Sequence, residues 1–214
     1  MLTTYIILIA VFIVSYLIGS INSAIIAGKL KSGDDIRSHG SGNAGATNAL
    51  RTYGKGTAVL VVLGDCLKAA ICCIIAIFAA RYTPLGTQNT ELAIYSAGIG
   101  VAIGHNFPIY FGFKGGKGVL VSVTALFFAD WKIALVVTVI SILIIALTKK
   151  VSLGSIMGAV MFMAAALIFK LDNLPYIIFT FFLTLLSIIR HRENIKRLIN
   201  GTESNITDNK NERQ

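Results

Sequence analysis

"YIILIAVFIVSYLIGSINSAIIAG", residues 5–28, is the stretch of this sequence that decides the fold. It contains no charged side chain, and it is longer than the roughly 20 apolar residues that a helix needs to cross a bilayer. No basic residue precedes it and no small-residue cleavage site follows it, as both would in a secretory signal peptide. We therefore expect a membrane-spanning helix here.

The rest of the chain continues this pattern. Of its 214 residues, 55% are hydrophobic and 14% are charged, whereas about a quarter of the residues of a soluble domain are charged. The sequence thus predicts an all-α polytopic membrane protein with about seven transmembrane helices. We expect one integral membrane domain over 1–200 and a polar, disordered tail over 201–214. The seven apolar segments lie at 4–27, 56–80, 92–106, 118–130, 131–148, 152–170 and 174–190.

Basic residues are distributed unevenly between the two sides of such a protein. A net charge of +9 is also found in nucleic-acid-binding proteins, but most of the 19 Lys and Arg residues fall in loops and a tail on one side. The positive-inside rule makes that side cytoplasmic. We therefore expect the N-terminus outside, the C-terminus in the cytoplasm and no nucleic-acid partner. A five-span version, with segments 92–106 and 118–130 re-entrant, gives the same sidedness.

Three polar islands lie on this cytoplasmic side, at 37–56, 104–118 and 190–203. A lone histidine more often serves structure than chemistry, but three on one face, one in each island, favour function. The three cysteines show neither metal-ligand spacing nor a disulfide pattern, so we predict no metal site and no cofactor. The histidines are His39, His105 and His191.

The first island, "RSHGSGNAGATNALRTYGKG", is suited to hold an anion. Its glycines let the backbone turn sharply and point N–H groups inward. Segment 40–45 has the GxGxxG form of a dinucleotide fingerprint, but it follows a membrane span and not a strand, which argues against a Rossmann site. A flexible loop with a membrane-anchoring arginine remains the alternative. The candidate anion-binding residues here are Ser41, Gly42, Asn43, Asn48 and Arg51.

The second island, "GHNFPIYFGFKGGKG", resembles a nucleotide-binding P-loop only loosely. Gly118 and Val119 follow Lys117, so the Ser or Thr hydroxyl that holds magnesium after the lysine of a P-loop is missing, which argues against a nucleoside triphosphatase. Two lysines on a glycine turn at the start of a helix remain, and this arrangement favours phosphate. Simple anchoring of the lysines at the membrane surface is the alternative. The candidate phosphate-binding residues are His105, Lys114, Gly115, Gly116 and Lys117.

The third island begins where the last apolar segment ends. His191 and Asn194 lie three residues apart, and therefore near one face of a helix. Contact with anionic lipid explains a basic helix but not this pair. Asp65 and Lys68 inside the second segment have the same spacing, and charges in a membrane should pair. We expect a structural ion pair there, with a role at the site as the alternative.

Together, "SGNAGATNALR" (41–51), "GHNFPIYFGFKGGKG" (104–118) and "RHRENIKRLINGTE" (190–203) resemble the three signature motifs of the bacterial acyl-phosphate:glycerol-3-phosphate acyltransferases, the PlsY family. The resemblance implies a seven-helix enzyme of the bacterial inner (plasma) membrane, with its active site facing the cytoplasm. Such an enzyme transfers a fatty acyl group from acyl phosphate to the 1-hydroxyl of sn-glycerol 3-phosphate. The products are lysophosphatidic acid and inorganic phosphate, in the first step of phospholipid synthesis.

The resemblance also assigns roles to individual residues. The His-x4-Asp dyad of the common soluble-type acyltransferases is absent, and an acyl phosphate already carries a good leaving group. Positioning and stabilisation of oxyanion charge therefore suffice for catalysis. The implied roles are catalysis for Ser41, Arg51, His191 and Asn194, glycerol 3-phosphate binding for Gly115, Gly116 and Lys117, and structure for Glu203.

Two questions remain open at the level of sequence. His191 is either the general base or, with Asn194, a donor that positions phosphate, and we favour the second. A transporter or channel for a phosphorylated metabolite is the alternative to an enzyme, although the chain shows no inverted repeat. The sequence predicts no particular oligomeric state.

Overall fold

The computed structural model describes residues 1–206 and 208, and every regular element in them is a helix. Short 3₁₀ turns lie at η1 (Ile36–Ser38), η2 (Thr87–Asn89) and η3 (Ile109–Phe111). The α-helices of this part of the chain are α1 (Leu2–Gly19), α2 (Ser23–Ser32), α3 (Ala46–Tyr53), α4 (Lys55–Tyr82), α5 (Thr90–Asn106), α6 (Val119–Ala129), α7 (Trp131–Thr148), α8 (Val151–Phe169), α9 (Leu174–Arg190) and α10 (Arg192–Ile199).

The helices confirm an all-α membrane protein. Five helical stretches among the described residues are long and apolar enough to cross a bilayer, or six if α9 and α10, which bend by 61°, form one broken span. The number seven stays a prediction, because α6 has 11 residues and at 1.5 Å per residue reaches only about 16 Å. The sidedness of the two termini also stays a prediction.

A turn interrupts the first apolar segment at residues 20–22, although the composition of the segment does not indicate it. α1 ends at Gly19 and α2 begins at Ser23, because the side chain of Asn22 accepts hydrogen bonds from the N–H groups of Ala24 and Ile25. An asparagine in this capping position starts a new helix. α2 then leads the chain into the first island.

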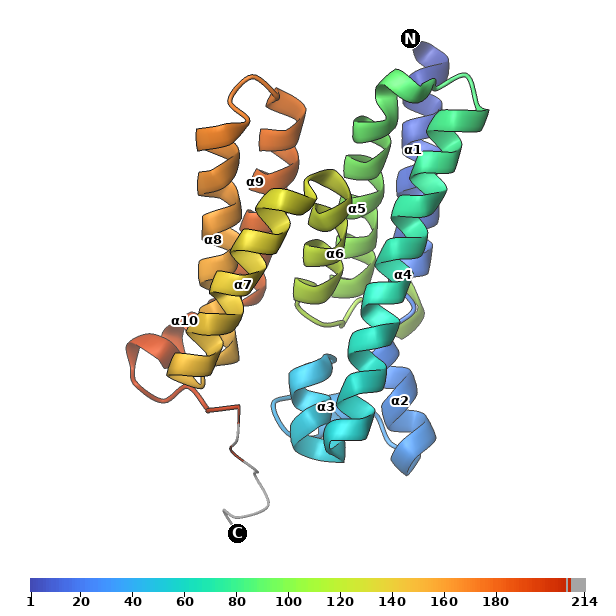
Figure 1. The fold of residues 1–214 in the computed structure, drawn as a ribbon. Coiled ribbons are helices and arrows are strands. Elements are labelled where there is room, and N and C mark those ends of the chain that lie inside the picture. Colours follow the sequence, from blue (N-terminus) through green and yellow to red (C-terminus); the bar gives the residue numbers. More distant parts are fainter. Residues whose placement is uncertain (207, 209–214) are drawn as a thin grey trace.

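Two groups of helices face each other (Figure 1). α1, α4 and α5 pack together on one side, α7, α8 and α9 on the other, and α6 lies between the groups. The groups meet where α5 contacts α9, and there Tyr95 stacks on Phe179 with 4.9 Å between ring centroids. α2, α3 and α10 gather at the end opposite the N-terminus, so the three islands come together at one end of the bundle.

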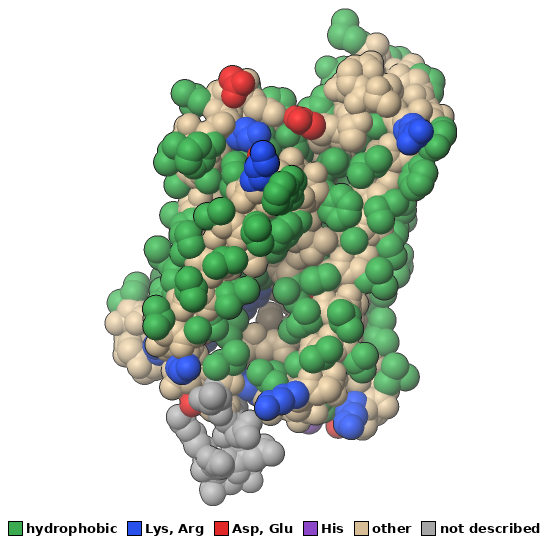
Figure 2. Space-filling model, in the orientation of Figure 1, with side chains coloured by type: hydrophobic (Ala, Val, Ile, Leu, Met, Phe, Trp, Pro, Cys, Tyr) green, Lys and Arg blue, Asp and Glu red, His purple; other side chains and the backbone are tan. Residues whose placement is uncertain are grey.

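Large apolar side chains cover the outer faces of the long helices. Ile9 of α1, Leu63 of α4 and Leu143 of α7 are all exposed. Figure 2 shows hydrophobic side chains over the middle of the molecule, with Lys and Arg gathered toward its two ends. A bilayer covers such an apolar belt.

Candidate active site

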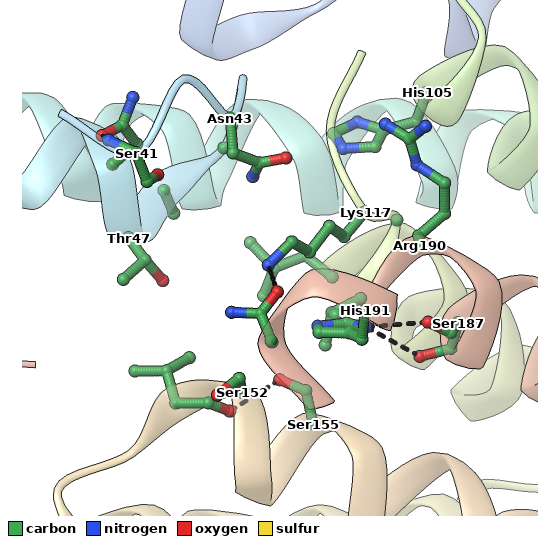
Figure 3. A pocket seen from close by; sticks show the side chains of 18 of the residues that line it. Ser41, Asn43, Thr47, His105, Lys117, Ser152, Ser155, Ser187, Arg190 and His191 are labelled. Atoms are coloured by element: carbon green, nitrogen blue, oxygen red, sulfur yellow. Dashed lines mark hydrogen bonds between the residues drawn. The ribbon is translucent and has the colours of Figure 1, made fainter. Parts of the chain in front are cut away.

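A cavity of about 1550 Å³ lies where the three islands meet. Its walls come from the first island and α3, from the loop before α6, and from α8, α9 and α10. All the predicted site residues line it except Gly116 and Lys68. In Figure 3, Ser41, Asn43 and Thr47 lie on one side of the cavity, with Lys117 and His191 beyond them. Segments far apart in the sequence therefore form one site.

The first island is shaped from inside by Asn48, which is 1% exposed. Its Oδ1 accepts a hydrogen bond from the N–H of Ser41 at 2.9 Å, and its Nδ2 donates to the carbonyls of Ile36 and His39 at 3.1 and 3.0 Å. A Cβ on Gly40, where φ is +59°, would collide with this amide. Asn48 was predicted to contact phosphate, but its amide already holds the loop that presents Ser41.

Free donors remain at the start of α3. Within the described residues, the side chains of Ser41, Asn43 and Thr47 have no hydrogen-bond partner, and no side chain caps the helix. The first N–H groups of an α-helix have no partner inside the helix, and together with the helix dipole they favour an anion. The first turn of α3 and these three side chains can therefore hold a phosphate.

The glycine pair of the second island packs against the end of α5. The N–H of Gly115 donates to the carbonyl of Asn106 at 3.2 Å, and that of Gly116 to the carbonyl of His105 at 3.1 Å. A Cβ on either glycine would collide with His105. Since both N–H groups are used, the glycines permit this close packing, and neither has a free N–H for the phosphate contact predicted for it.

Two arginines fasten this loop to the other islands. Arg190 donates from Nε and Nη2 to the carbonyl of Gly116 at 3.1 and 2.8 Å, and its guanidinium lies 5.2 Å from the ring centre of Phe107. Arg37 donates from Nη1 to the carbonyls of Phe111 and Lys114 at 2.7 and 2.8 Å. The loop before α6 is thus fixed by Arg190 from the third island and by Arg37 from the first.

A chain of polar contacts links the second and third islands through Asn194. Lys117 donates from Nζ to Asn194 Oδ1, and Asn194 Nδ2 donates to Glu203 Oε1 at 2.7 Å. Glu203 also accepts from Ser152 Oγ at 2.7 Å and from Arg197 Nε at 2.8 Å. Burial lowers the pKa of Lys117 to about 8, and the carboxylate of Glu203 opposes that shift. Glu203 therefore orders the wall that carries Lys117.

Arg51 reaches the cavity from α3, and part of its fork is occupied by the chain itself. Its Nη2 donates to the carbonyls of Ser204 and Asn205 at 3.4 and 2.8 Å, while its Nε is buried without a partner in the described residues. Ile206 donates its N–H to the carbonyl of Lys149 at 2.8 Å. The first residues of the tail, expected to be disordered, thus lie against the site. Residues 207 and 209–214 lie outside the described residues.

His191 sits at the bend between α9 and α10 and is 2% exposed. Its Nδ1 lies 2.8 Å from the carbonyl oxygen of Ser187. A carbonyl only accepts, so Nδ1 carries the proton and Nε2 of the neutral ring is an acceptor. Burial, then the charge of Lys117, lowers the pKa of His191 to about 4. The ring is therefore neutral near pH 7, and its free nitrogen accepts where the sequence led us to expect a donor.

The remaining wall of the cavity is apolar and reaches the surface of the bundle. Figure 2 shows the surface hollowed between the α4 side and the α7 side. The apolar lining residues include Ala58 and Val62 of α4, Val119, Val123 and Leu126 of α6, Ile142 and Ile145 of α7, Phe162 of α8 and Leu183 of α9. The site thus joins a polar, cationic end to an apolar wall.

Comparison with known proteins decides the family. A family described as glycerol-3-phosphate acyltransferase matches residues 9–201 of the chain. This chain belongs to the glycerol-3-phosphate acyltransferase family. Its three polar islands, which carried the resemblance, are also the segments that form the cavity.

Relatives and solved structures agree with this acyltransferase family. A glycerol-3-phosphate acyltransferase of Clostridioides difficile (strain 630) is 44% identical over 204 residues, which cover 94% of this chain and 97% of that protein. One from Shouchella clausii (strain KSM-K16) is 45% identical over 203 residues, covering 93% and 96%. The crystal structure of PlsY, an integral membrane glycerol 3-phosphate acyltransferase, in its glycerol 3-phosphate form has a TM-score of 0.81. That protein is 32% identical, and the match covers 92% of this chain and 94% of the other.

Sequence reasoning missed several side chains of this acyltransferase site. Thr47, Ser152 and Ser187 line the cavity but belong to no predicted set. Arg37 and Arg190 lie in the islands, but nothing in their spacing indicates that they clamp backbone carbonyls. Three predicted residues have clear positions: Lys114 is exposed at the cavity, and Asp65 and Lys68 form the expected ion pair at 2.9 Å.

Proposed function

We propose that this membrane enzyme transfers an acyl group from acyl phosphate to the 1-hydroxyl of sn-glycerol 3-phosphate. The observation that carries the proposal is the two-part cavity, in which hydrogen-bond donors suited to phosphate face an apolar wall. Related PlsY structures in glycerol 3-phosphate and lysophosphatidic acid forms support the acceptor and the product. An acyl phosphate suits such a site because it has a phosphate at one end and a hydrocarbon chain at the other.

The cavity offers donors for two phosphates. The first turn of α3, with Ser41 and Asn43, forms one group of donors, and Arg51 with Lys117 forms a second. An arginine fork matches phosphate with two parallel hydrogen bonds, while a lysine contributes a point charge. Each of the two substrates carries one phosphate, so the supply of donors fits the proposed pair.

The transfer needs no covalent intermediate on the protein. The 1-hydroxyl oxygen of glycerol 3-phosphate attacks the carbonyl carbon of acyl phosphate and forms the new ester bond. The bond from that carbon to the phosphate oxygen breaks, and the hydroxyl proton leaves with the phosphate, giving hydrogen phosphate. His191 Nε2 accepts the hydrogen bond of the hydroxyl and aligns it for attack. With a pKa of about 4, this ring aligns the hydroxyl without keeping its proton.

Purified protein mixed with acyl phosphate and glycerol 3-phosphate is expected to release inorganic phosphate and form lysophosphatidic acid in equal amounts. Glycerol in place of glycerol 3-phosphate should give neither, because the acceptor phosphate is lost. Acyl-CoA in place of acyl phosphate should also fail. Robust turnover with acyl-CoA would contradict the donor assignment. Uptake of glycerol 3-phosphate into proteoliposomes without phosphate release would indicate transport instead.

We also propose that the cavity faces the cytoplasm of a bacterial inner membrane, because the basic residues concentrate at its end of the bundle. In a background without Cys66, Cys72 and Cys73, Lys55→Cys and Lys196→Cys should resist an impermeant thiol reagent added to intact cells. Gln88→Cys, at the opposite end, should be labelled. All three positions are exposed. The reverse pattern of labelling would invert the topology.

The charge of Lys117 should limit the activity of the enzyme at alkaline pH. Burial lowers its pKa to about 8, so the side chain is charged below that pH and neutral above it. We expect kcat/KM for glycerol 3-phosphate to fall as the pH rises through about 8. Lys117→Arg should move the limit to higher pH, because a guanidinium stays charged. The exposed Lys114→Arg serves as the control and should leave the limit in place. If kcat/KM of Lys117→Arg still falls near pH 8, another group causes the alkaline loss of activity.

A further inference from the structure

A buried polar cluster behind the cavity has no part in the proposed reaction so far. It consists of Ser23 of α2, Asp65 and Lys68 of α4, and His105 of α5. Asp65 is 2% exposed, His105 4% and Lys68 6%. Charges buried this deeply are costly even when paired, and in a membrane they commonly mark a functional site. Asp65 and His105 also line the cavity, whereas Lys68 does not.

The contacts of Lys68 fix the protonation pattern of the cluster. Its Nζ lies 2.9 Å from Asp65 Oδ1, 2.8 Å from the carbonyl oxygen of Ile21 and 2.9 Å from His105 Nδ1. An ammonium group has three N–H donors and accepts no hydrogen bond. Each of its three partners must therefore accept. His105 Nδ1 carries a lone pair, and the proton of the neutral ring is on Nε2.

Asp65 supports this arrangement without replacing Lys68 in it. Its Oδ1 accepts from Ser23 Oγ at 3.0 Å and lies 3.5 Å from His105 Nδ1. That second distance is too long to compete with the 2.9 Å contact from Lys68. Asp65 therefore neutralises Lys68 and holds its ammonium group beside the ring.

His105 is itself a lining residue of the cavity, and the Nε2 edge of its ring faces Gly116. A Cβ on Gly116 would collide with Nε2, so the bare glycine leaves room for this nitrogen. No described residue accepts a hydrogen bond from Nε2. In Figure 3 the ring lies between Asn43 and Arg190, near the donors of the first island. Nε2–H is thus a donor without a partner among the described residues, on a ring that lines the cavity in which a phosphate is proposed to bind.

We propose that Lys68 is a positioning residue that holds His105 in the Nε2–H tautomer, so that His105 donates to a phosphate oxygen of a bound substrate. This inference rests on the proposed acyl transfer. It gives the two buried histidines opposite tasks. His105 keeps its proton on Nε2 and donates to phosphate, while His191 keeps its proton on Nδ1 and accepts from the hydroxyl.

Nitrogen-15 NMR of histidine-labelled protein in detergent tests the tautomers without any turnover. His105 should show a protonated Nε2 and a lone pair on Nδ1, and His191 the reverse. His39→Gln removes the third histidine signal, and His191→Gln assigns the second. Addition of glycerol 3-phosphate, or of inorganic phosphate alone, should shift the His105 Nε2 signal. A proton on Nδ1 of His105 in the unmodified protein would overturn the proposal whatever the enzyme's reaction proves to be.

Substitutions of His105 test the donor itself. A glutamine amide lies near the position of Nε2, whereas an asparagine amide reaches only that of Nδ1. His105→Gln should therefore keep most of the activity, and His105→Asn should raise KM for one of the two substrates about 10- to 150-fold, the value of one charge-assisted hydrogen bond. Measuring KM for both substrates shows which phosphate is held. Equal KM values in two variants of equal melting temperature would contradict the role of Nε2–H.

Substitutions of Lys68 test the positioning. Lys68→Met combined with Asp65→Leu removes both charges, so that no buried ion is left unpaired. This pair should release the tautomer, giving signals from both forms of His105, and should raise KM by the reciprocal of the fraction that keeps Nε2–H, about twofold for an even mixture. Lys68→Arg keeps an N–H beside Nδ1 and should retain the single tautomer. A fixed Nε2–H tautomer with an unchanged KM in the double variant would make the cluster purely structural.

Discussion

Arg51→Lys is expected to lower kcat/KM about 10- to 150-fold, although the net charge of the protein does not change. The fork of Arg51 faces the cavity, and its Nε has no partner in the described part of the chain. A lysine supplies one charged group but not the two parallel bonds that a phosphate takes from a guanidinium. Losing one charge-assisted hydrogen bond costs about 1.5–3 kcal/mol, which gives the expected range at about 1.4 kcal/mol per decade.

Steady-state kinetics with acyl phosphate and glycerol 3-phosphate measures this loss. Arg192→Lys is the matched control, because it makes the same chemical change on a side chain that is 76% exposed and does not line the cavity. Arg192→Lys should keep the activity of the unmodified protein. A folded Arg51→Lys variant with a near-normal rate would reduce Arg51 to a membrane-side anchor.

Substitutions of His191 should distinguish the roles of its two ring nitrogens. A glutamine amide oxygen can take the place of Nε2 as acceptor, whereas an asparagine amide can keep only the bond from Nδ1 to Ser187. We expect His191→Gln to retain a measurable fraction of the activity, and His191→Asn and His191→Ala to lose about 100-fold, the effect of a misaligned nucleophile. His39→Ala should be nearly silent, because that ring does not line the cavity.

The pH profile of the glutamine variant decides the role of His191. With a pKa of about 4, the ring stays neutral through the working range. An acidic limb near pH 6 then reports a substrate phosphate, whose second pKa is about 6. The limb should persist in His191→Gln. If it disappears, or if glutamine is as inactive as alanine, His191 itself takes the proton.

The helices were largely predictable because hydrocarbon imposes a simple rule on composition. Segments predicted at 131–148, 152–170 and 174–190 correspond to α7, α8 and α9 within one residue at each end. Each apolar run there stops at Lys, Asp, Asn or Arg, which the bilayer core excludes. The break between α1 and α2 was missed, because one asparagine among apolar residues gives no periodic signal and acts only through its capping bonds.

The motifs identified which residues would meet, but not which of their atoms would remain free. Asn48, Gly115 and Gly116 were expected to contact phosphate, yet their donors are used within the protein. Such pairing depends on contacts between segments many residues apart, for which a local pattern carries no information. The tautomer of His191 depends likewise on a single backbone carbonyl, so its acceptor nitrogen could be recognised only in three dimensions.

The hollow between the α4 and α7 sides affects how the enzyme encounters a lipid donor. An acyl chain that enters there stays in hydrocarbon from arrival to release. Each methylene moved into water costs about 0.8 kcal/mol, so a fatty chain forced out of the bilayer would lose on the order of 10 kcal/mol. The proposed acyl phosphate donor is therefore sampled by diffusion in two dimensions. Its mole fraction in the membrane governs turnover, so added inert lipid slows the reaction, whereas added buffer that contains glycerol 3-phosphate at the same concentration leaves the turnover number unchanged.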